Sequence, residues 1–202
     1  MSKLRAFAGA IALMSATALA APAVAGPKED LEQVTRSIAS TKSMTANFVQ
    51  TDGKGRSMKG ALSLQRPGKI RFDYGKGSDM LLVSDGKTLS FVDYSVGQVS
   101  DWPVAKSPLA ILLSPNPDLR RIARVISNEK GVLTVRARDA RHPEFGTLIL
   151  AFNKNGAAPG GLELGGWVAI DAQNKKTKVT LSGQRYNVGI PASRFTFEKP
   201  KK

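Results

Sequence analysis

The residues that most often carry catalysis are sparse in this chain. His142 is the single histidine and stands in the turn-like stretch Arg141-His142-Pro143-Glu144, with no second histidine or cysteine to complete a common metal site. Ser84-Asp85 falls in a predicted hairpin turn and lacks the strand-turn-helix context of a nucleophile elbow. We therefore expect no enzyme activity, no catalytic residue, no bound metal and no cofactor.

Two glycine pairs invite comparison with phosphate-binding loops. Gly160-Gly161 and Gly165-Gly166 flank the apolar run Leu162–Leu164. This spacing does not match a nucleotide fingerprint. Glycines inside strands often mark bends, so we interpret both pairs as bends in a sheet.

One arginine has a position that suggests a role other than catalysis. Arg66 has the same strand parity as Leu62 and Leu64, so an uninterrupted strand points its guanidinium toward an apolar side. An unpaired charge there is costly, and the guanidinium would need hydrogen-bond partners. The alternative is a strand-end arginine whose charged head reaches water beside Pro67.

Most of the chain alternates between apolar and polar residues with a period of two. Met44, Ala46 and Phe48 share one face of a predicted strand that ends at the turn Asp52–Gly55. Further strands are predicted at residues 58–64, 70–74, 80–83, 88–93, 99–102, 122–127, 132–138, 146–152, 161–171, 177–184 and 195–197. Regular short strands with few helices indicate an antiparallel sheet that is curled or closed.

A helix is predicted before the first strand. It begins at or just before Asp30, and its apolar residues Leu31, Val34 and Ile38 have helical spacing. The helix ends near residues 40–42.

A second, shorter helix is predicted in the middle of the chain. Ser107 is the expected N-cap and Pro108 the first helical residue, and Pro115 stops the helix soon after Leu113. Because the run 109–113 is apolar on nearly every side, this helix should not face water.

The first 25 residues resemble a cleaved secretory signal. Lys3 and Arg5 precede an apolar stretch, Ala6–Ala20, which is too short to span a bilayer, and Ala23-Val24-Ala25 is a small-x-small cleavage site. No cysteine follows the cut to carry acyl chains. We expect residues 1–25 to be removed and residues 26–202 to form a single domain without a lipid anchor.

The chain is strongly basic, with a formal net charge of +14. Such an excess favours anionic surfaces, either of a membrane or of an acidic partner, although solvated strand faces and turns also explain each local group. The charge is spread along the chain instead of forming one basic helix, so nucleic acid is not an expected partner.

Several segments, in order and spacing, resemble the LolA family of periplasmic carriers of outer-membrane lipoproteins. They are the opening amphipathic helix, Phe48-Val49-Gln50, Leu64-Gln65-Arg66-Pro67-Gly68-Lys69-Ile70-Arg71-Phe72, Leu82-Val83-Ser84-Asp85-Gly86-Lys87-Thr88-Leu89, Ser107-Pro108 and Phe195-Thr196-Phe197. The resemblance implies a mainly β fold with some α structure, an incomplete (half-open) antiparallel β-barrel with a helical lid over an apolar cavity.

The resemblance also implies a function. The chain would be a periplasmic chaperone that binds the acyl chains of lipoproteins released from the inner membrane and shuttles them to the outer membrane. Removing one acyl chain from water is favourable by on the order of 10 kcal/mol, so a lipoprotein cannot cross an aqueous compartment with its acyl chains exposed. The implied partners are acylated lipoproteins as cargo, an inner-membrane ABC exporter of the Lol type and an outer-membrane receptor of the LolB type, with transient membrane-surface contact and a monomeric carrier.

The same resemblance assigns site residues. In the family, the arginine matching Arg66 bonds to lid carbonyls and holds the empty cavity shut, which makes Arg66 the expected gate. Strand alternation suggests a cavity lining, and the short middle helix suggests a lid. The expected lining residues are Met58, Leu62, Leu64, Phe72, Met80, Val83, Phe91, Leu148, Leu150 and Trp167, with Ile70 between them. The expected lid residues are Leu109, Ile111, Leu112 and Leu113.

Other functions remain open at this point. A carrier of another envelope lipid would differ only in cargo, because apolar linings do not encode a head group. A periplasmic lipid or lipoprotein sensor could use the same fold, although such sensors usually have a second domain. A polyanion-binding β-protein would show strongly salt-dependent binding with no need for acyl chains.

Overall fold

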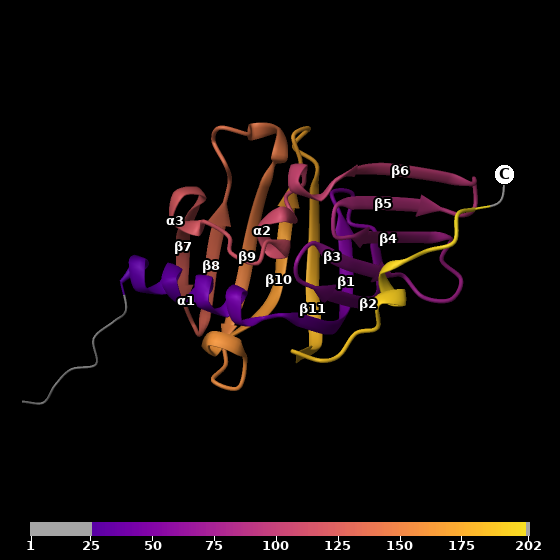
Figure 1. Cartoon of the computed structure of the whole chain (residues 1–202). Coiled ribbons are helices and arrows are strands. Elements are labelled where there is room, and N and C mark those ends of the chain that lie inside the picture. Colours follow the sequence, from indigo (N-terminus) through magenta and orange to yellow (C-terminus); the bar gives the residue numbers. More distant parts are fainter. Residues whose placement is uncertain (1–25, 201–202) are drawn as a thin grey trace, which may run out of the picture.

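The computed structural model describes residues 26–200, and the predicted signal peptide, residues 1–25, lies outside the described residues. Eleven antiparallel strands form one sheet in the order β6-β5-β4-β3-β2-β1-β11-β10-β9-β8-β7 (Figure 1). The strands are β1 (Ser43–Asp52), β2 (Ser57–Gln65), β3 (Lys69–Asp73), β4 (Met80–Asp85), β5 (Thr88–Asp93), β6 (Gln98–Pro103), β7 (Ala123–Glu129), β8 (Val132–Ala137), β9 (Thr147–Lys154), β10 (Leu162–Ile170) and β11 (Lys176–Tyr186).

The order of the strands explains why the sheet stays open. From β1 to β6 each strand pairs with the next, and the chain then crosses to β7 at the other edge and returns strand by strand to β11, which pairs with β1. No pairing joins β6 to β7 within the described residues, so these strands remain the two edges. The expected incomplete antiparallel barrel is confirmed.

The register places the apolar residues on one face. Met44 lies opposite Leu64, which lies opposite Ile70, and all three side chains are at most 1% exposed. A one-residue shift would move every apolar side chain to the other face, so burial of this face fixes the pairing. The helices cover this face, which we call the concave face.

Helix α1 (Pro27–Ser40) lies across part of the concave face. Pro27 opens it, and Val34 and Ile38 are buried, as their spacing predicts. Two polar contacts fix α1 to the sheet: Ser37 Oγ donates to the Leu162 carbonyl at 3.1 Å, and Asn128 Nδ2 donates to Asp30 Oδ2 at 2.7 Å.

The middle helix is shorter than predicted. Helix α2 spans Ala110–Leu113, and Ser107 is not its N-cap. The Ser107 hydroxyl instead donates back to the Val104 carbonyl at 2.8 Å and closes a short 3₁₀ helix, Val104–Lys106, which the sequence did not reveal. Leu112 and Leu113 are each 1% exposed, whereas Ala110 and Ile111 are partly exposed, so the prediction that this helix avoids water is confirmed for half of it. A third helix, α3 (Leu119–Ile122), precedes β7.

Val83 was wrongly predicted to line the cavity. Phe72 pairs with Leu82 on the concave face, so Val83, the next residue, points to the opposite side of the sheet. There it packs with Leu81 and Val92 in a second, smaller cluster. Strand alternation places neighbouring residues on opposite faces, and both faces of β4 are apolar.

The predicted strand at residues 195–197 is also wrong. Ala192–Phe195 is a short 3₁₀ helix, and Phe195 is buried. Phe197 packs against the second cluster, and Arg71 Nη1 donates to the Thr196 carbonyl at 3.1 Å. The segment covers the outer face of β3 and β4, whose backbones already pair with strands on both sides, and so it cannot join the sheet.

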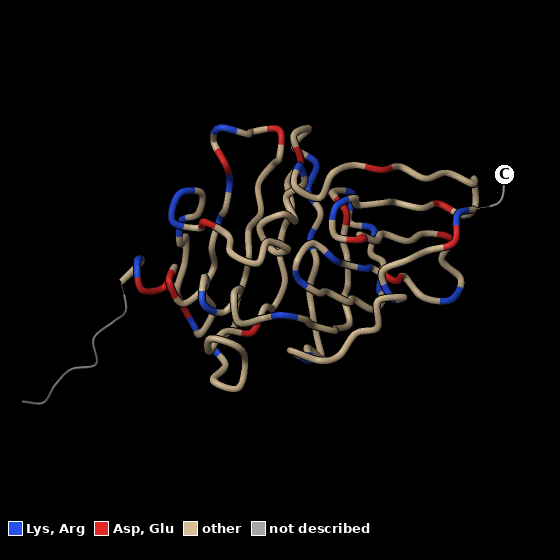
Figure 2. Tube along the Cα trace, in the orientation of Figure 1, with Lys and Arg blue, Asp and Glu red and all other residues tan. Residues whose placement is uncertain are grey.

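Charged residues are dispersed over strands and loops. Lys and Arg are interleaved with Asp and Glu along the chain (Figure 2). Within the described residues, no helix is long and apolar enough to cross a membrane.

Candidate functional site

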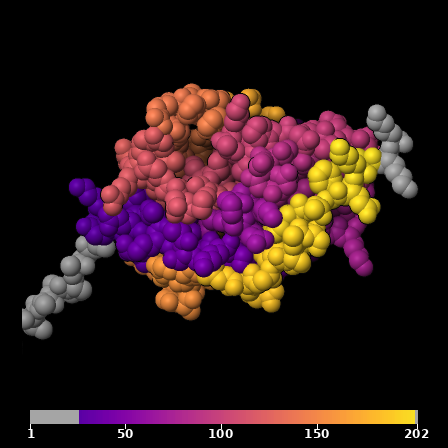
Figure 3. All heavy atoms as spheres, in the orientation of Figure 1, coloured from indigo at the N-terminus to yellow at the C-terminus, as the bar shows by residue number. Residues whose placement is uncertain are grey.

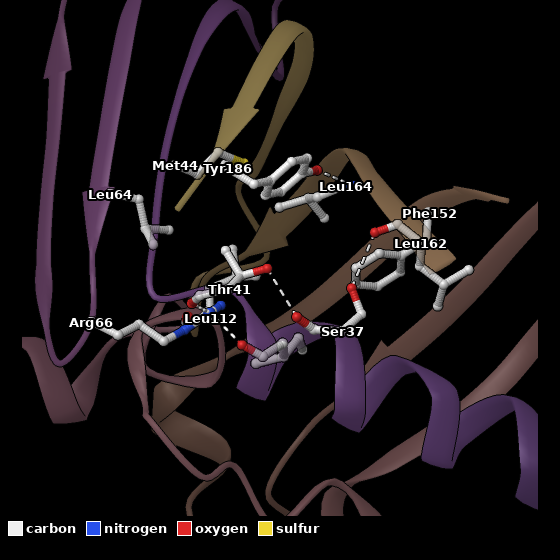
Figure 4. Close-up of a pocket in the computed structure, with 11 residues that line it drawn as sticks. Ser37, Thr41, Met44, Leu64, Arg66, Leu112, Phe152, Leu162, Leu164 and Tyr186 are labelled. Carbon is white, nitrogen blue, oxygen red and sulfur yellow. Dashed lines mark hydrogen bonds between the residues drawn. The ribbon is translucent and has the colours of Figure 1, made fainter. Parts of the chain in front are cut away.

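A small enclosed cavity lies where α1 and α2 meet the concave face (Figure 4). Its free volume is about 10 Å³, room for at most one water molecule. A cavity of this size has no room for an acyl chain while α1 and α2 occupy these positions. The lining residues come from both helices and from five strands: Ser37, Ile38, Thr41, Met44, Leu64, Arg66, Leu112, Phe152, Leu162, Leu164 and Tyr186.

The helices adjoin one another on the outside of the molecule. In the space-filling view the atoms of α1 adjoin those of the middle segment that contains α2 and α3 (Figure 3). Beneath this cover the side chains of Leu64 and Phe152 are each 1% exposed, and Leu112, on α2 itself, is also 1% exposed. The cover therefore hides apolar surface that would face water if the helices moved away.

Arg66 joins both helices to the sheet. Its Nε donates to the Leu112 carbonyl in α2 at 2.6 Å, and its Nη1 donates to the carbonyls of Ile38 and Thr41 at the end of α1. The last carbonyls of a helix have no partner inside the helix, and a cation near that end is favourable. The guanidinium thus satisfies backbone groups of the two covering helices with one side chain.

The side chain of Arg66 points where strand parity places it. Arg66 is partly buried, and burial lowers the pKa of its guanidinium from 12.5 to about 10. It stays charged at neutral pH. No carboxylate among residues 26–200 pairs with it, so neutral carbonyls alone accept its hydrogen bonds. The water-facing alternative for this arginine is not the arrangement observed.

In the wall formed by β10 and β11, side chains of β11 bond to the backbone of Leu164. The Leu164 N–H donates to the Tyr186 hydroxyl at 2.9 Å, and Gln184 Nε2 donates to the Leu164 carbonyl at 2.8 Å. The pairing of β10 with β11 runs from Gly166 opposite Thr180 to Ile170 opposite Lys176, so Leu164 lies beyond it and its backbone bonds to side chains of β11. Burial raises the pKa of Tyr186 above its ordinary value. The lining therefore presents mainly apolar surface to the cavity.

Apart from Val83, the predicted lining residues fall into two groups. One group is fully buried on the concave face: Leu62, Leu64, Phe72, Leu148, Leu150 and Trp167. The rings of Phe72 and Trp167 meet edge to face at 6.1 Å. Of this group only Leu64 lines the small cavity.

The second group lies away from the enclosed cavity and is partly exposed. Met58 and Met80 line an open groove of about 570 Å³ together with Tyr74, and Phe91 is half-buried on β5. The Tyr74 hydroxyl donates to Gln50 Oε1 at 3.0 Å, and burial raises its pKa to about 12. The structure does not bring these residues to the enclosed cavity.

The predicted lid residues lie in and just before α2. Leu109, Leu112 and Leu113 are buried, and Ile111 is partly buried. The sequence reading did not assign α1 to the lid, although α1 and its C-cap residue Thr41 supply two of the three carbonyls that Arg66 binds.

The residues first considered for catalysis do not assemble. His142 Nδ1 lies 3.1 Å from Glu144 Oε1 in an exposed turn, and its ring stacks on Phe145 at 4.8 Å. The Ser84 hydroxyl is fully buried and donates to the Gly68 carbonyl at 2.8 Å. Across residues 26–200 we found no group of three side chains suited to hold a metal ion.

Comparison with known proteins gives a consistent result. The family model described as outer membrane lipoprotein carrier protein LolA matches residues 39–198. An outer-membrane lipoprotein carrier protein from Chromobacterium violaceum is 30% identical over 195 residues, covering 92% of this chain and 90% of that protein. A protein of the same description from Bordetella avium is 30% identical over 203 residues, 94% of each chain. One from Pseudomonas fluorescens is 29% identical over 191 residues, 88% of this chain and 87% of the relative.

Proposed function

Because this chain belongs to the LolA family of outer membrane lipoprotein carrier proteins, we propose that it is a chaperone that binds the acyl chains of lipoproteins released from the inner membrane and carries them to the outer membrane. Its cargo is therefore acylated lipoprotein. The protein would bind and release its cargo reversibly, without a chemical step, a metal or a cofactor.

The observation that carries the proposal is the closed apolar cavity beneath helices held by Arg66. Hiding an acyl chain from water stabilises it by roughly 0.8 kcal/mol per methylene. An apolar cavity achieves this without directional bonds, so it can accept chains attached to many different proteins. Since the cavity has almost no free volume, the helices must be displaced for a chain to enter.

Arg66 supports a gate between the empty and loaded states. An acyl chain that lifts α1 and α2 breaks the bonds from Arg66 to Leu112, Ile38 and Thr41. Re-forming those bonds favours the empty, closed state and so helps to expel cargo at its destination. In the open state the concave residues Leu62, Leu64, Phe72, Leu148, Leu150 and Trp167 would contact the acyl chains, and Met58, Met80 and Phe91 would extend this surface toward the rim.

Export and partners complete the proposal. We place the protein in the periplasm, with residues 1–25 removed after Ala25 and residues 26–202 acting as a single, monomeric carrier domain. It would receive cargo from an inner-membrane ABC exporter of the Lol type and deliver it to a receptor of the LolB type.

The proposal can be tested by lipoprotein release. Spheroplasts that display a triacylated lipoprotein are incubated with purified residues 26–202, and soluble complexes are weighed by native mass spectrometry. Wild type should release a one-to-one complex. Arg66→Leu should accept cargo but fail to pass it to outer-membrane vesicles, whereas the control Arg36→Leu, an exposed arginine of α1, should behave as wild type.

Two outcomes would contradict the proposal in different ways. Release of no lipoprotein, with another lipid co-purifying in the cavity, would favour a carrier of a different envelope lipid. Equal onward transfer by wild type and Arg66→Leu would remove the gate but leave the carrier role intact.

A further inference from the structure

Two turns of the sheet meet beneath α2. The turn between β2 and β3 contains Gly68, and the turn between β4 and β5 contains Gly86. The Gly68 N–H donates to the Leu113 carbonyl at 3.0 Å. Arg66 donates to the preceding carbonyl, that of Leu112. Two adjacent carbonyls of α2 are thus bound by the same turn, one through a side chain and one through the backbone.

The conformation at Gly68 requires glycine. Its φ is +74°, in the left-handed region, and a Cβ there would lie 2.2 Å from the Gly86 carbonyl oxygen. The two turns are therefore in direct backbone contact, and the position of one restricts the other.

Ser84 links these two turns through one hydroxyl group. Its Oγ donates to the Gly68 carbonyl at 2.8 Å and accepts the Gly86 N–H at 3.1 Å, and the residue is 0% exposed. The N–H and the carbonyl of Gly68 are separated only by the φ and ψ of that residue. Holding the carbonyl toward Ser84 therefore restricts the direction of the N–H that faces Leu113.

We propose that Ser84 is a positioning residue of the lid: its buried hydroxyl holds Gly68 so that the Gly68 N–H forms a second closing bond to α2 beside that of Arg66. This inference rests on the proposed function, in which the lid opens for cargo. It assigns part of the gate to a backbone bond. The donor and the acceptor of that bond remain when the Arg66 side chain is removed, but the bond opens more often because both bonds hold α2. The Ser84 hydroxyl bonds to Gly68 and Gly86, and its effect on α2 passes through Gly68.

The bond can be tested in the empty protein by hydrogen exchange of ¹⁵N-labelled residues 26–202, read amide by amide by NMR. In Ser84→Ala the Gly68 amide should exchange about tenfold faster, the change expected from loss of one buried hydrogen bond. Amides inside β1 should change less than about twofold. The matched control is Ser90→Ala, which removes another buried hydroxyl, bonded to Asp101 at 2.5 Å on the neighbouring strand. It should leave the Gly68 amide unchanged.

Two results of this experiment would overturn the inference. Unchanged exchange at Gly68 in Ser84→Ala would show that the hydroxyl does not position the bond. An equal rise at all protected amides would show a loss of global stability and no local role.

A second measurement leaves Ser84 in place and covers the case in which Ser84→Ala does not fold. In Arg66→Leu the Gly68 amide should also lose protection, because both bonds end on α2. Full protection of that amide in Arg66→Leu would likewise overturn the inference. Since no cargo is present in either measurement, a negative result is distinct from a failure of lipoprotein release.

Discussion

The protein covers two apolar surfaces of one sheet in different ways. On the concave face, α1 and α2 are held by Arg66, whose partners are three neutral carbonyls. On the outer face of β3 and β4, the C-terminal segment is held by Arg194, which lies 3.2 Å from Asp73 and donates to Ser63 at 3.3 Å.

We propose that this difference distinguishes a cover that opens for cargo from one that stays in place. A charge satisfied by carbonyls can be freed when water or another group takes their place, and burial already disfavours the charged form of Arg66. The outer cover adds an opposite charge and the buried ring of Phe195. We expect changes at the outer cover to alter stability and changes at the concave cover to alter transport.

The largest effect on stability is expected at Phe195. Phe195→Ala should lower the free energy of unfolding by about 3 kcal/mol, because it deletes a buried ring that also lies beneath the Lys69 ammonium at 5.8 Å. Urea unfolding measures this loss. The control Phe145→Ala removes a partly exposed ring and should cost less. A loss of cargo transfer at unchanged stability would contradict the division between the two covers.

The next effect concerns Arg66 and should appear in transfer more than in stability. Arg66→Leu should reduce onward transfer about tenfold or more, since hydrogen bonds from a charged donor contribute about 1.5–3 kcal/mol each. Its free energy of unfolding should change by less than about 1 kcal/mol, because an apolar side chain removes the desolvation cost of the charge. Transfer assays paired with urea unfolding test both parts. A large destabilisation with normal transfer would make Arg66 a structural residue.

A smaller effect is expected at Arg194. Arg194→Leu should lower the free energy of unfolding by about 1 kcal/mol or less, since its ion pair with Asp73 is partly exposed. The difference from wild type should shrink at high salt. Arg141→Leu, which breaks an exposed pair with Asp139, is the matched control and should change stability less.

The smallest effect is a dependence on pH in the turn beneath the lid. The N–H groups of Thr88 and Lys87 donate to the Asp85 carboxylate and lower its pKa below 3.8. A carboxylate with a lowered pKa in the folded state stabilises the fold above its unfolded pKa, and this contribution is lost as pH falls through the folded value. The stability difference between wild type and Asp85→Ala should therefore be present at pH 7 and decline below about pH 4. A difference that is constant from pH 7 to pH 2 would exclude this cause.

Alternation predicted much of the sheet because it is a local property. Met44, Ala46 and Phe48 are buried and Asn47 and Val49 are exposed, as the period of two requires. Ten of the strands after the first were placed near their observed positions for the same reason. The same rule separates Met80 from Val83 and would have prevented the wrong assignment of Val83.

Segments without a periodic pattern were predicted less well. Ser107 has the residue type of an N-cap, yet its hydroxyl bonds backward to Val104. Phe195 and Phe197 have the residue types of a strand, but they pack on the outer face of the sheet because β3 and β4 have no free edge to pair with them. In both places the local conformation depends on tertiary contacts that the residue types do not reveal.

The sequence by itself determined the family resemblance, the faces of the strands and the direction of Arg66, because these follow from residue types and strand parity. Only the tertiary structure decided which groups Arg66 meets. Its acceptors are backbone carbonyls of Ile38, Thr41 and Leu112, and every residue has such a carbonyl, so no residue type marks them. The cavity likewise required β11 to pair with β1, which brings Tyr186 beside Met44 from the far end of the chain.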